Sequence, residues 1–329
     1  MVNKMRFWFF IIKRIISAFI TLIGLTFIVF ALSYMSGNNK GINEPLYLGY
    51  FYWIKSFFSG NLGYANTPIY SGSVGTAILL FLPNTIMLTI ISSILVWIIG
   101  VSLGVFSATK RDSILDYSVR GISSILYSTP IYLIAIVLII IFGVELKILP
   151  FSGTLNPLLA SNLSWYKNGI SYPTHIILID ALLHGNIPVF WDALLHTILP
   201  ALTLALATVA GMIRILRSSM LEVLDQDYVR FARAKGVPEK VVINLHARRN
   251  ALIPVLTLYG YTIASLLSGT VVVESIFNYP GIGYWTTQAI LSGSINGIMA
   301  STLIFGIVFV SISLILDIMY AIIDPRIRY

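Results

Sequence analysis

Residues 227–254 read DYVRFARAKGVPEKVVINLHARRNALIP, a charged stretch in an otherwise apolar chain. These 28 positions hold eight charged residues, whereas the other 301 positions hold 26. Before Gly236 the acidic residues come first and the basic residues last, which complements a helix dipole. We therefore predict a helix over 218–235, a left-handed turn residue at Gly236 and a second helix with Pro238 in its first turn. A solvated connector would explain the basic residues but not these ordered breaks.

The rest of the chain has the composition of a membrane protein. Of its 329 residues 57% are hydrophobic and only 10% are charged, whereas soluble proteins carry about 25% charged residues. Six apolar runs have about the length that a spanning helix needs: residues 15–35, 84–106, 122–142, 197–213, 251–273 and 298–316. The composition predicts an all-α polytopic membrane protein with six transmembrane helices. Pro200 and Pro254 lie early in the fourth and fifth runs, where we expect a helix to kink or begin.

The basic residues set the predicted topology. With the N-terminus inside, 17 of the 21 Lys and Arg residues fall in cytoplasmic segments, and only Lys40, Lys55, Lys147 and Lys167 lie outside. This asymmetry follows the positive-inside rule. We predict that both termini and a loop at about 214–252 are cytoplasmic. The same asymmetry attributes the net positive charge to membrane topology and not to nucleic-acid binding. A first part over 1–82 would hold one span and an extracytoplasmic loop, and a core over 83–329 would hold five spans.

The sequence lacks the residues that several kinds of chemistry require. No glycine is followed by lysine, so the chain has no phosphate-binding loop of the P-loop type. The middles of the six runs carry no charge, so a proton relay has no evident carrier. With no cysteine there is no thiolate metal site. We interpret five further residues as solvated or interfacial because their spacing matches no metal motif: His175, Asp180, His184, Asp192 and His196.

Read as a whole, the chain resembles a known family. The stretch DYVRFARAKGVPEKVVINLHARRNALIPVLT resembles the cytoplasmic EAA-type loop of ABC importer permeases, in the dipeptide, oligopeptide and nickel branch. Further segments resemble the same branch in the same order: LPNTIMLTI, IGVSLGVFSATKRDSILDYSV, STPIYL, LHTILPALTLAL, VVVESIFNYPGIG and DPRIRY. The chain departs from the pattern at Arg230, which replaces the motif's glutamate, and after the first span, where it has SGNN.

The resemblance implies a type I ABC importer permease fold and a set of partners. These are a homologous second permease, two ABC ATPase domains, an extracytoplasmic solute-binding protein and the lipid bilayer. ATP and Mg would be bound by the ATPases, so this chain needs no cofactor and performs no catalysis. The resemblance assigns ATPase coupling to Asp227, Tyr228, Arg230, Ala232, Arg233, Ala234, Lys235, Gly236 and Pro238. It assigns the link from this loop to the fifth span to His246, Asn250 and Pro254.

By this resemblance the chain is a multi-pass permease of a prokaryotic plasma membrane. Peptides are the preferred solute class, and oligosaccharides and nickel are alternatives within the same importer class. From another class, a secondary transporter or a channel is the rival. The charge-free middles of the spans and the ordered loop argue against that rival.

Overall fold

A computed structural model describes residues 2–35 and 45–323, and it describes the side chains of all of these except 2–11, 33, 268 and 317–323. The predicted outside residue Lys40, the segment SGNN and the C-terminal residues Arg326 and Arg328 therefore lie outside the described residues.

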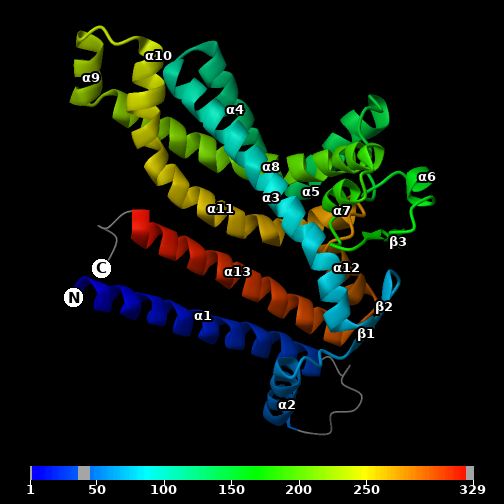
Figure 1. Ribbon diagram of the computed structural model, residues 1–329. Coiled ribbons are helices and arrows are strands. Elements are labelled where there is room, and N and C mark those ends of the chain that lie inside the picture. The colour runs from blue at the N-terminus through cyan, green and yellow to red at the C-terminus, as the bar shows by residue number, and fades with distance from the viewer. Residues whose placement is uncertain (1, 36–44, 324–329) are drawn as a thin grey trace. The chain divides into compact units, whose positions relative to one another are not determined.

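Helices make up most of the described chain (Figure 1). The long ones are α1 (Val2–Met35), α3 (Val74–Thr109), α8 (Ile187–Leu224), α11 (Arg248–Ile276) and α13 (Ile295–Ile323). The shorter helices are α2 (Leu46–Phe58), α4 (Ile114–Ser128), α5 (Ile131–Leu138), α6 (Pro157–Ala160), α7 (Ile177–Leu183), α9 (Asp227–Ala234), α10 (Glu239–Val241) and α12 (Ile282–Leu291). Two π-helical segments, η1 (Ile139–Glu145) and η2 (Val242–Ala247), adjoin α5 and α10.

Two small antiparallel hairpins accompany the helices, and the sequence reasoning did not foresee them. β1 (Tyr64–Thr67) pairs with β2 (Tyr70–Ser73), with Tyr64 opposite Ser73. β3 (Tyr166–Lys167) pairs with β4 (Ile170–Ser171), with Tyr166 opposite Ser171. Asn168 and Gly169 turn the second hairpin with φ of 51° and 84°. Asparagine and glycine are the residue types that most readily adopt this conformation.

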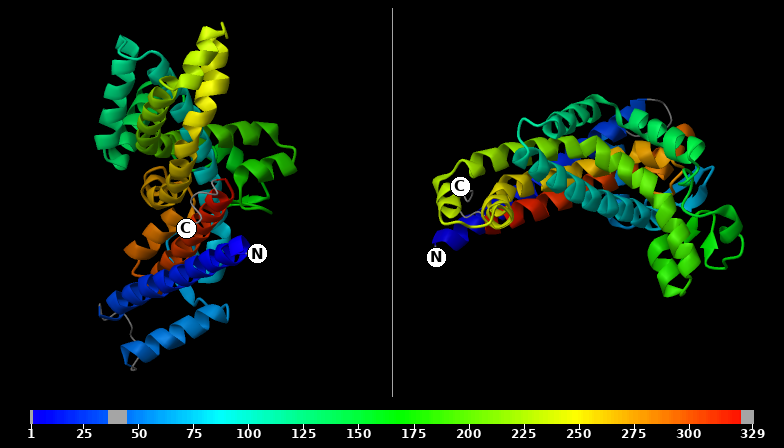
Figure 2. Two further views of the ribbon diagram at one scale, coloured as in Figure 1. Left: turned by 90° about the vertical axis from the view of Figure 1, so that its left-hand side faces the viewer. Right: turned by 90° about the horizontal axis from the view of Figure 1, so that it is seen from above.

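The chain divides into two compact units. The first combines Met1–Met87, Ser152–Leu194 and Thr270–Tyr329. In it α1 lies alongside α13, as the blue and red helices of Figure 2 show. Its core lies where β1, the start of α3, α12 and α13 meet, and Phe81 stacks on Trp285 there with ring centroids 6.4 Å apart.

The second unit combines Leu88–Phe151 and Leu195–Gly269. Its core joins α3, α8 and α11 through Val96, Leu216, Ala251 and other buried side chains. A Cβ at Gly104 would lie 2.9 Å from the Cβ of Leu216. The glycine therefore permits a close contact between α3 and α8.

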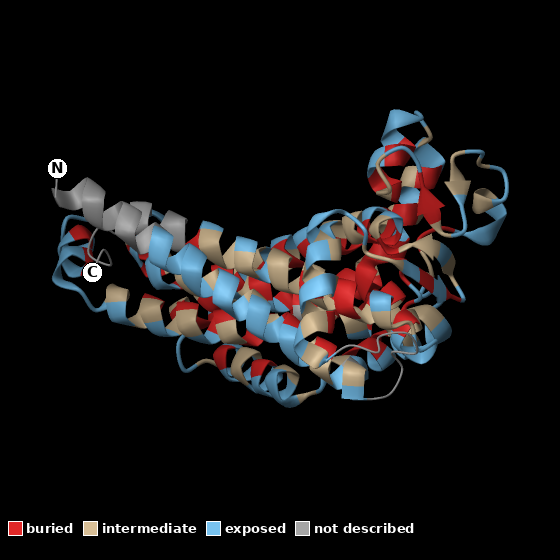
Figure 3. Cartoon of the chain, turned by 90° about the horizontal axis from the view of Figure 1, so that it is seen from below, coloured by how far each residue is buried: buried red, intermediate tan, exposed pale blue. Residues whose placement is uncertain are grey.

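Five helices are long and apolar enough to cross a membrane, or six if the bent pair Ile114–Ser128 and Ile131–Glu145 forms one span; this holds for the described residues. Buried and exposed positions alternate along these helices (Figure 3). Exposed side chains on α1 include Ile15, Ile20 and Leu32. Lipid tails are as apolar as leucine, so such side chains need no protein partner in a bilayer.

The prediction of one spanning helix over 122–142 was wrong, because the segment is divided between two helices. The two parts of the bent pair meet at 113°. Thr129 has an extended backbone, with φ −90° and ψ 126°, and Pro130 begins the next helix as its N-cap. Proline restricts the preceding residue to extended conformations and has no N–H for helical bonding. By contrast, Pro200 and Pro254 lie inside α8 and α11, so neither helix begins at its proline.

Candidate functional site

The charged stretch forms a helix, a tight turn and a second short helix, as predicted. α9 begins after Gln226, and its C-cap is Lys235. Gly236 has φ +77°; its N–H donates to the carbonyl of Arg233 at 2.9 Å, and the N–H of Val237 donates to that of Ala232 at 3.2 Å. This pair of bonds is a Schellman motif, which needs a left-handed residue at its centre. Pro238 is the N-cap of α10, one position before the predicted first turn.

The single helix predicted over 218–235 was wrong, because the chain breaks at 225–226. Gln226 is extended, with φ −72° and ψ 148°, and separates α8 from α9. The break turns α9 so that the buried residues Val229 and Ala232 pack with Val242 and with Val223 and Leu224 at the end of α8. An uninterrupted helix would carry Val229 away from these apolar partners. Burial of this small cluster therefore favours the break.

Polar side chains also contact one another across the turn. Arg233 donates to both carboxylate oxygens of Glu239, from Nε at 3.1 Å and from Nη2 at 2.8 Å. The hydrogen bond to Glu239 raises the pKa of the Arg233 guanidinium above its usual value. Lys235 places its Nζ 4.4 Å from the ring centre of Phe231. Exposed ion pairs contribute little stability, so we assign the fold of the turn mainly to Gly236 and the apolar cluster.

A hydrogen bond joins α9 to α11. The side-chain amide of Asn250 donates to the hydroxyl of Tyr228 at 2.8 Å and to the carbonyl of His246 at 3.1 Å. The structure thus brings Tyr228, from the predicted coupling group, together with two residues of the predicted link. Pro254 is exposed one turn further along α11 and makes no part of this contact.

The predicted coupling residues differ in where they face. Ala232 is buried against the chain's own cluster and leaves 8% of its surface exposed. The other predicted coupling residues are exposed: Asp227, Tyr228, Arg230, Arg233, Ala234, Lys235, Gly236 and Pro238. Figure 1 shows α9 and α10 at one end of the second unit. This end offers a partner an exposed, mainly basic surface with two small residues, Ala234 and Gly236.

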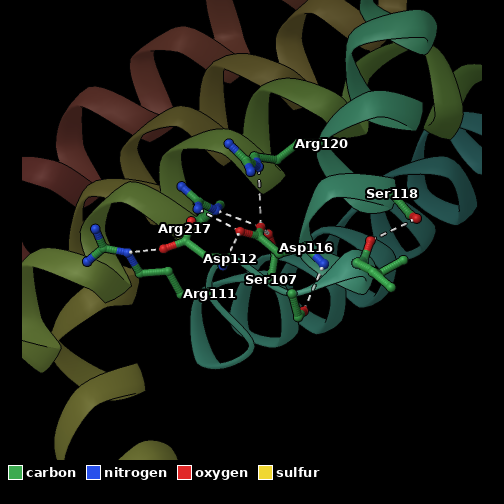
Figure 4. A network of polar contacts seen from close by, with 9 residues as sticks. Ser107, Arg111, Asp112, Asp116, Ser118, Arg120 and Arg217 are labelled. Carbon is green, nitrogen blue, oxygen red and sulfur yellow. Dashed lines mark hydrogen bonds and ion pairs between the residues drawn. The ribbon is translucent and has the colours of Figure 1, made fainter.

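Sequence reasoning missed a buried carboxylate, Asp116, in the same unit (Figure 4). Arg217 on α8 donates to it twice, from Nε to Oδ1 at 2.9 Å and from Nη2 to Oδ2 at 2.8 Å. The hydroxyl of Ser107 also donates to Oδ1, and the N–H of Asp112 donates to Oδ2 at 3.1 Å. Arg120 lies 3.5 Å from the same carboxylate. The signal in the sequence was an arginine within an apolar helix, which requires a counter-charge when buried.

A second buried carboxylate, Glu274, lies in the first unit, two residues before α11 ends. Its oxygens accept from the hydroxyl of Thr85 at 2.7 Å and from the N–H of Tyr284 at 3.0 Å. Thr85 in turn accepts from the N–H of Ile282 at 2.8 Å. These bonds fix the connection between α11 and α12 to the first half of α3.

The prediction that the histidines and acidic residues of the outside connection are solvated or interfacial was wrong for Asp180 and His196, which are buried. Side chains of this connection also have local partners. The His184 ring stacks on Trp165 with centroids 4.5 Å apart, and Nδ1 of His175 lies 2.9 Å from the carbonyl of Ser171. Asp180 accepts from the N–H and the hydroxyl of Thr174 at 2.8 and 2.7 Å. Among the described residues, no three histidines or acidic residues are grouped as metal ligands.

The chain is similar in sequence to several known proteins. The sequence model of the family described as "Binding-protein-dependent transport system inner membrane component" matches residues 100–329. A probable D,D-dipeptide transport system permease protein of Escherichia coli is 37% identical over 87% of this chain and 82% of its own length. A dipeptide transport system permease protein of Alkalihalophilus pseudofirmus is 35% identical over 96% and 98%. An oligopeptide transport system permease protein of Bacillus subtilis is 37% identical over 88% and 83%.

Proposed function

Because the chain belongs to the family of binding-protein-dependent transport system inner membrane components, we propose that it is a permease subunit of an ATP-driven ABC importer for peptides. The observation that carries this proposal is the similarity to named peptide permeases along almost the whole chain. The exposed helix, turn and helix at 227–241 support it, because an importer subunit without a phosphate-binding loop needs a surface that engages a separate ATPase.

In this function the chain crosses a bacterial plasma membrane six times, with both termini in the cytoplasm. The bent pair of α4 with α5 and η1 provides the third crossing. A homologous second permease completes the translocation path, and an extracytoplasmic solute-binding protein delivers the solute. This chain then forms half of the translocation path.

The importer contains two ATPase domains, and one of them engages the loop between α8 and α11 of this chain. Exposed Ala234 and Gly236 allow close approach of a partner backbone, while Asp227, Arg230, Arg233 and Lys235 offer charges on the same exposed surface. Ala232 takes an indirect part, because its side chain packs on Val229 and Val242 and shapes the turn. The loop is connected to α11, the helix that contains Pro254, through the hydrogen bonds of Asn250 with Tyr228 and His246.

The solute class rests on the names of the relatives, which specify dipeptides and oligopeptides. Oligosaccharides and nickel are the alternatives for the same kind of importer. A secondary transporter or channel is the alternative from another class, and it would move solute without ATP.

Reconstitution tests the proposal. The purified chain alone should neither bind nor hydrolyse ATP, because it lacks a phosphate-binding loop. Proteoliposomes with both permeases, the ATPases and the binding protein should accumulate a radiolabelled dipeptide only with ATP. The same vesicles receive an oligosaccharide or Ni²⁺ in parallel. Uptake by this chain alone, driven by an ion gradient in the absence of ATP, would establish the secondary transporter instead.

A further inference from the structure

The fully buried side chains of α4 are polar, not apolar. Of its 15 residues, all of which the structure describes, only Asp116 and Ser123 are buried. Its large apolar side chains face outward; Ile114 and Ile125, for example, leave 84% and 67% of their surfaces exposed. Most helices of a folded unit are fixed by a buried apolar stripe. No apolar side chain of α4 is fully buried, although Val119 and Leu126 are half-buried, so its polar contacts carry more of the attachment than in most helices.

Those polar contacts converge on α8. Arg217 binds both oxygens of the buried Asp116, which is the stronger, geometrically defined form of an ion pair. One turn earlier, Arg214 places its guanidinium carbon 5.0 Å from the ring centre of Tyr127, near the other end of α4. Arg214 and Arg217, on one face of α8, thus contact α4 near both of its ends. Ser107 adds the end of α3 to the same carboxylate (Figure 4).

The part of α8 that contacts α4 leads directly to the loop at 227–241. Leu224 ends α8 seven residues after Arg217, roughly 10 Å at 1.5 Å per residue. Val223 and Leu224 pack on one side with Val229 and Ala232 of α9 and on the other with the core of α3, α8 and α11. A displacement of α9 therefore reaches Arg217 through a rigid helix. Through the contact of Arg217 with Asp116 the displacement reaches α4, whose far end meets the segment Ile131–Glu145 at 113°.

We propose that Asp116 and Arg217 are positioning residues that carry the movement of the 227–241 loop to α4, so that ATP hydrolysis without this pair no longer drives transport. The inference rests on the proposed function. We call the pair a joint, meaning the contact through which movement of the loop reaches α4. A purely structural pair would affect hydrolysis and transport together through the amount of folded protein. A joint affects the solute moved per ATP hydrolysed, and that ratio distinguishes the two roles.

The test uses the complete importer in proteoliposomes, with the relatives' solute, a dipeptide, as the probe. Asp116→Asn keeps the shape of the side chain but removes its charge. We expect membrane abundance within twofold of wild type, at least half of the ATPase rate, and at least a tenfold loss in dipeptide transported per ATP. The matched control is Glu145→Gln, which neutralises an exposed carboxylate at the end of η1 and should leave the ratio unchanged. An unchanged ratio in Asp116→Asn, or hydrolysis and transport falling in the same proportion, overturns the proposal.

Two further variants keep the test decisive if Asp116→Asn fails to accumulate. Arg217→Lys retains the positive charge but cannot form the two-pronged contact, and it should lower the ratio at least threefold. Asp116→Asn with Arg217→Gln removes both charges of the pair, and Arg120, which also faces Asp116, has 41% of its side chain exposed to solvent. A structural role therefore predicts recovery, whereas a joint predicts that the ratio stays low. A wild-type ratio in either variant overturns the proposal. The proposed function fails separately, when the wild-type importer shows no ATP-dependent uptake, and that outcome removes the joint with it.

Discussion

At the scale of single residues, Gly236 and Glu274 show two ways in which one position controls its surroundings. Within residues 227–254, all of them described, Gly236 alone has a positive φ. A Cβ at this glycine would meet no atom within 4 Å, so the backbone conformation, not space, demands glycine. Glu274 is the reverse case: its side chain is fully buried, and its contacts with Thr85 and Tyr284 make the position specific.

Replacing Gly236 by valine should therefore strain the turn without a clash. A β-branched residue at positive φ costs about 1–3 kcal/mol locally. We expect normal membrane abundance, reduced co-purification of the ATPases and at least a fivefold loss of uptake. Gly236→Asn is the control, because asparagine tolerates this conformation. If valine behaves like asparagine in uptake and co-purification, the loop is a plain connector.

Glu274→Gln should destabilise the first unit. The amide retains one acceptor oxygen where the carboxylate has two, so either Thr85 or Tyr284 loses its partner. A buried donor left unsatisfied costs about 1–3 kcal/mol. The midpoint of thermal unfolding of the purified chain in detergent should fall, while Glu145→Gln, at an exposed position, should leave it unchanged. Equal midpoints for the two variants would show that Glu274 does not fix the connection.

At the scale of elements, small changes in the chain decide where helices meet and break. The break at 225–226 exists because α9 gains apolar partners by turning, and the bend at Pro130 exists because proline ends one helix before the next begins. Gly104 allows α3 to approach α8, with the Leu216 Cβ 2.9 Å from the position a Cβ would take. Gly121, on α4, has no atom within 4 Å of the same position.

These two glycines give a matched pair of substitutions. Gly104→Ala should lower stability by about 1–3 kcal/mol, because Leu216 presents an atom next to its own backbone and cannot easily give way. Gly121→Ala should be neutral or raise stability by about 0.5–1 kcal/mol, since alanine favours helix. Thermal unfolding in detergent compares the two. A larger loss from Gly121→Ala would mean that the contact between α3 and α8 is looser than the structure indicates.

At the scale of the whole molecule, the number of crossings depends on one segment. Whether the bent pair of α4 with α5 and η1 crosses or returns determines if the crossings number six or five. An even number places both termini on one side, and an odd number separates them. The basic residues favour six, because this arrangement keeps 17 of 21 inside.

Cysteine labelling decides the crossing number, and the chain has no native cysteine to interfere. Exposed positions are available on successive connections: Ser59 after α1, Lys167 after the bent pair and Lys240 after α8. In sealed right-side-out vesicles, a membrane-impermeant maleimide should label cysteine at 59 and at 167 but not at 240. Labelling at 240 with protection at 167 would mean that the bent pair does not cross. Permeabilised vesicles supply the control, because all three positions should then react.

Sequence alone determined those features that depend on neighbouring residues. The long apolar helices follow from local hydropathy, and the turn at Gly236 follows from the backbone preference of one residue and its position after a helix. The family could also be inferred, because its motifs are short, local and ordered along the chain. Only the tertiary structure revealed the Asp116–Arg217 pair, whose members lie 101 positions apart, and the Thr85–Glu274 pair, separated by 189. Only it showed that Ala232 faces inward and that α8 stops before Gln226. The physical reason is that a buried charge needs a partner, which a distant segment brings to it, and that the break at 225–226 depends on apolar packing between the segments on either side of it. Local preference contains neither contact.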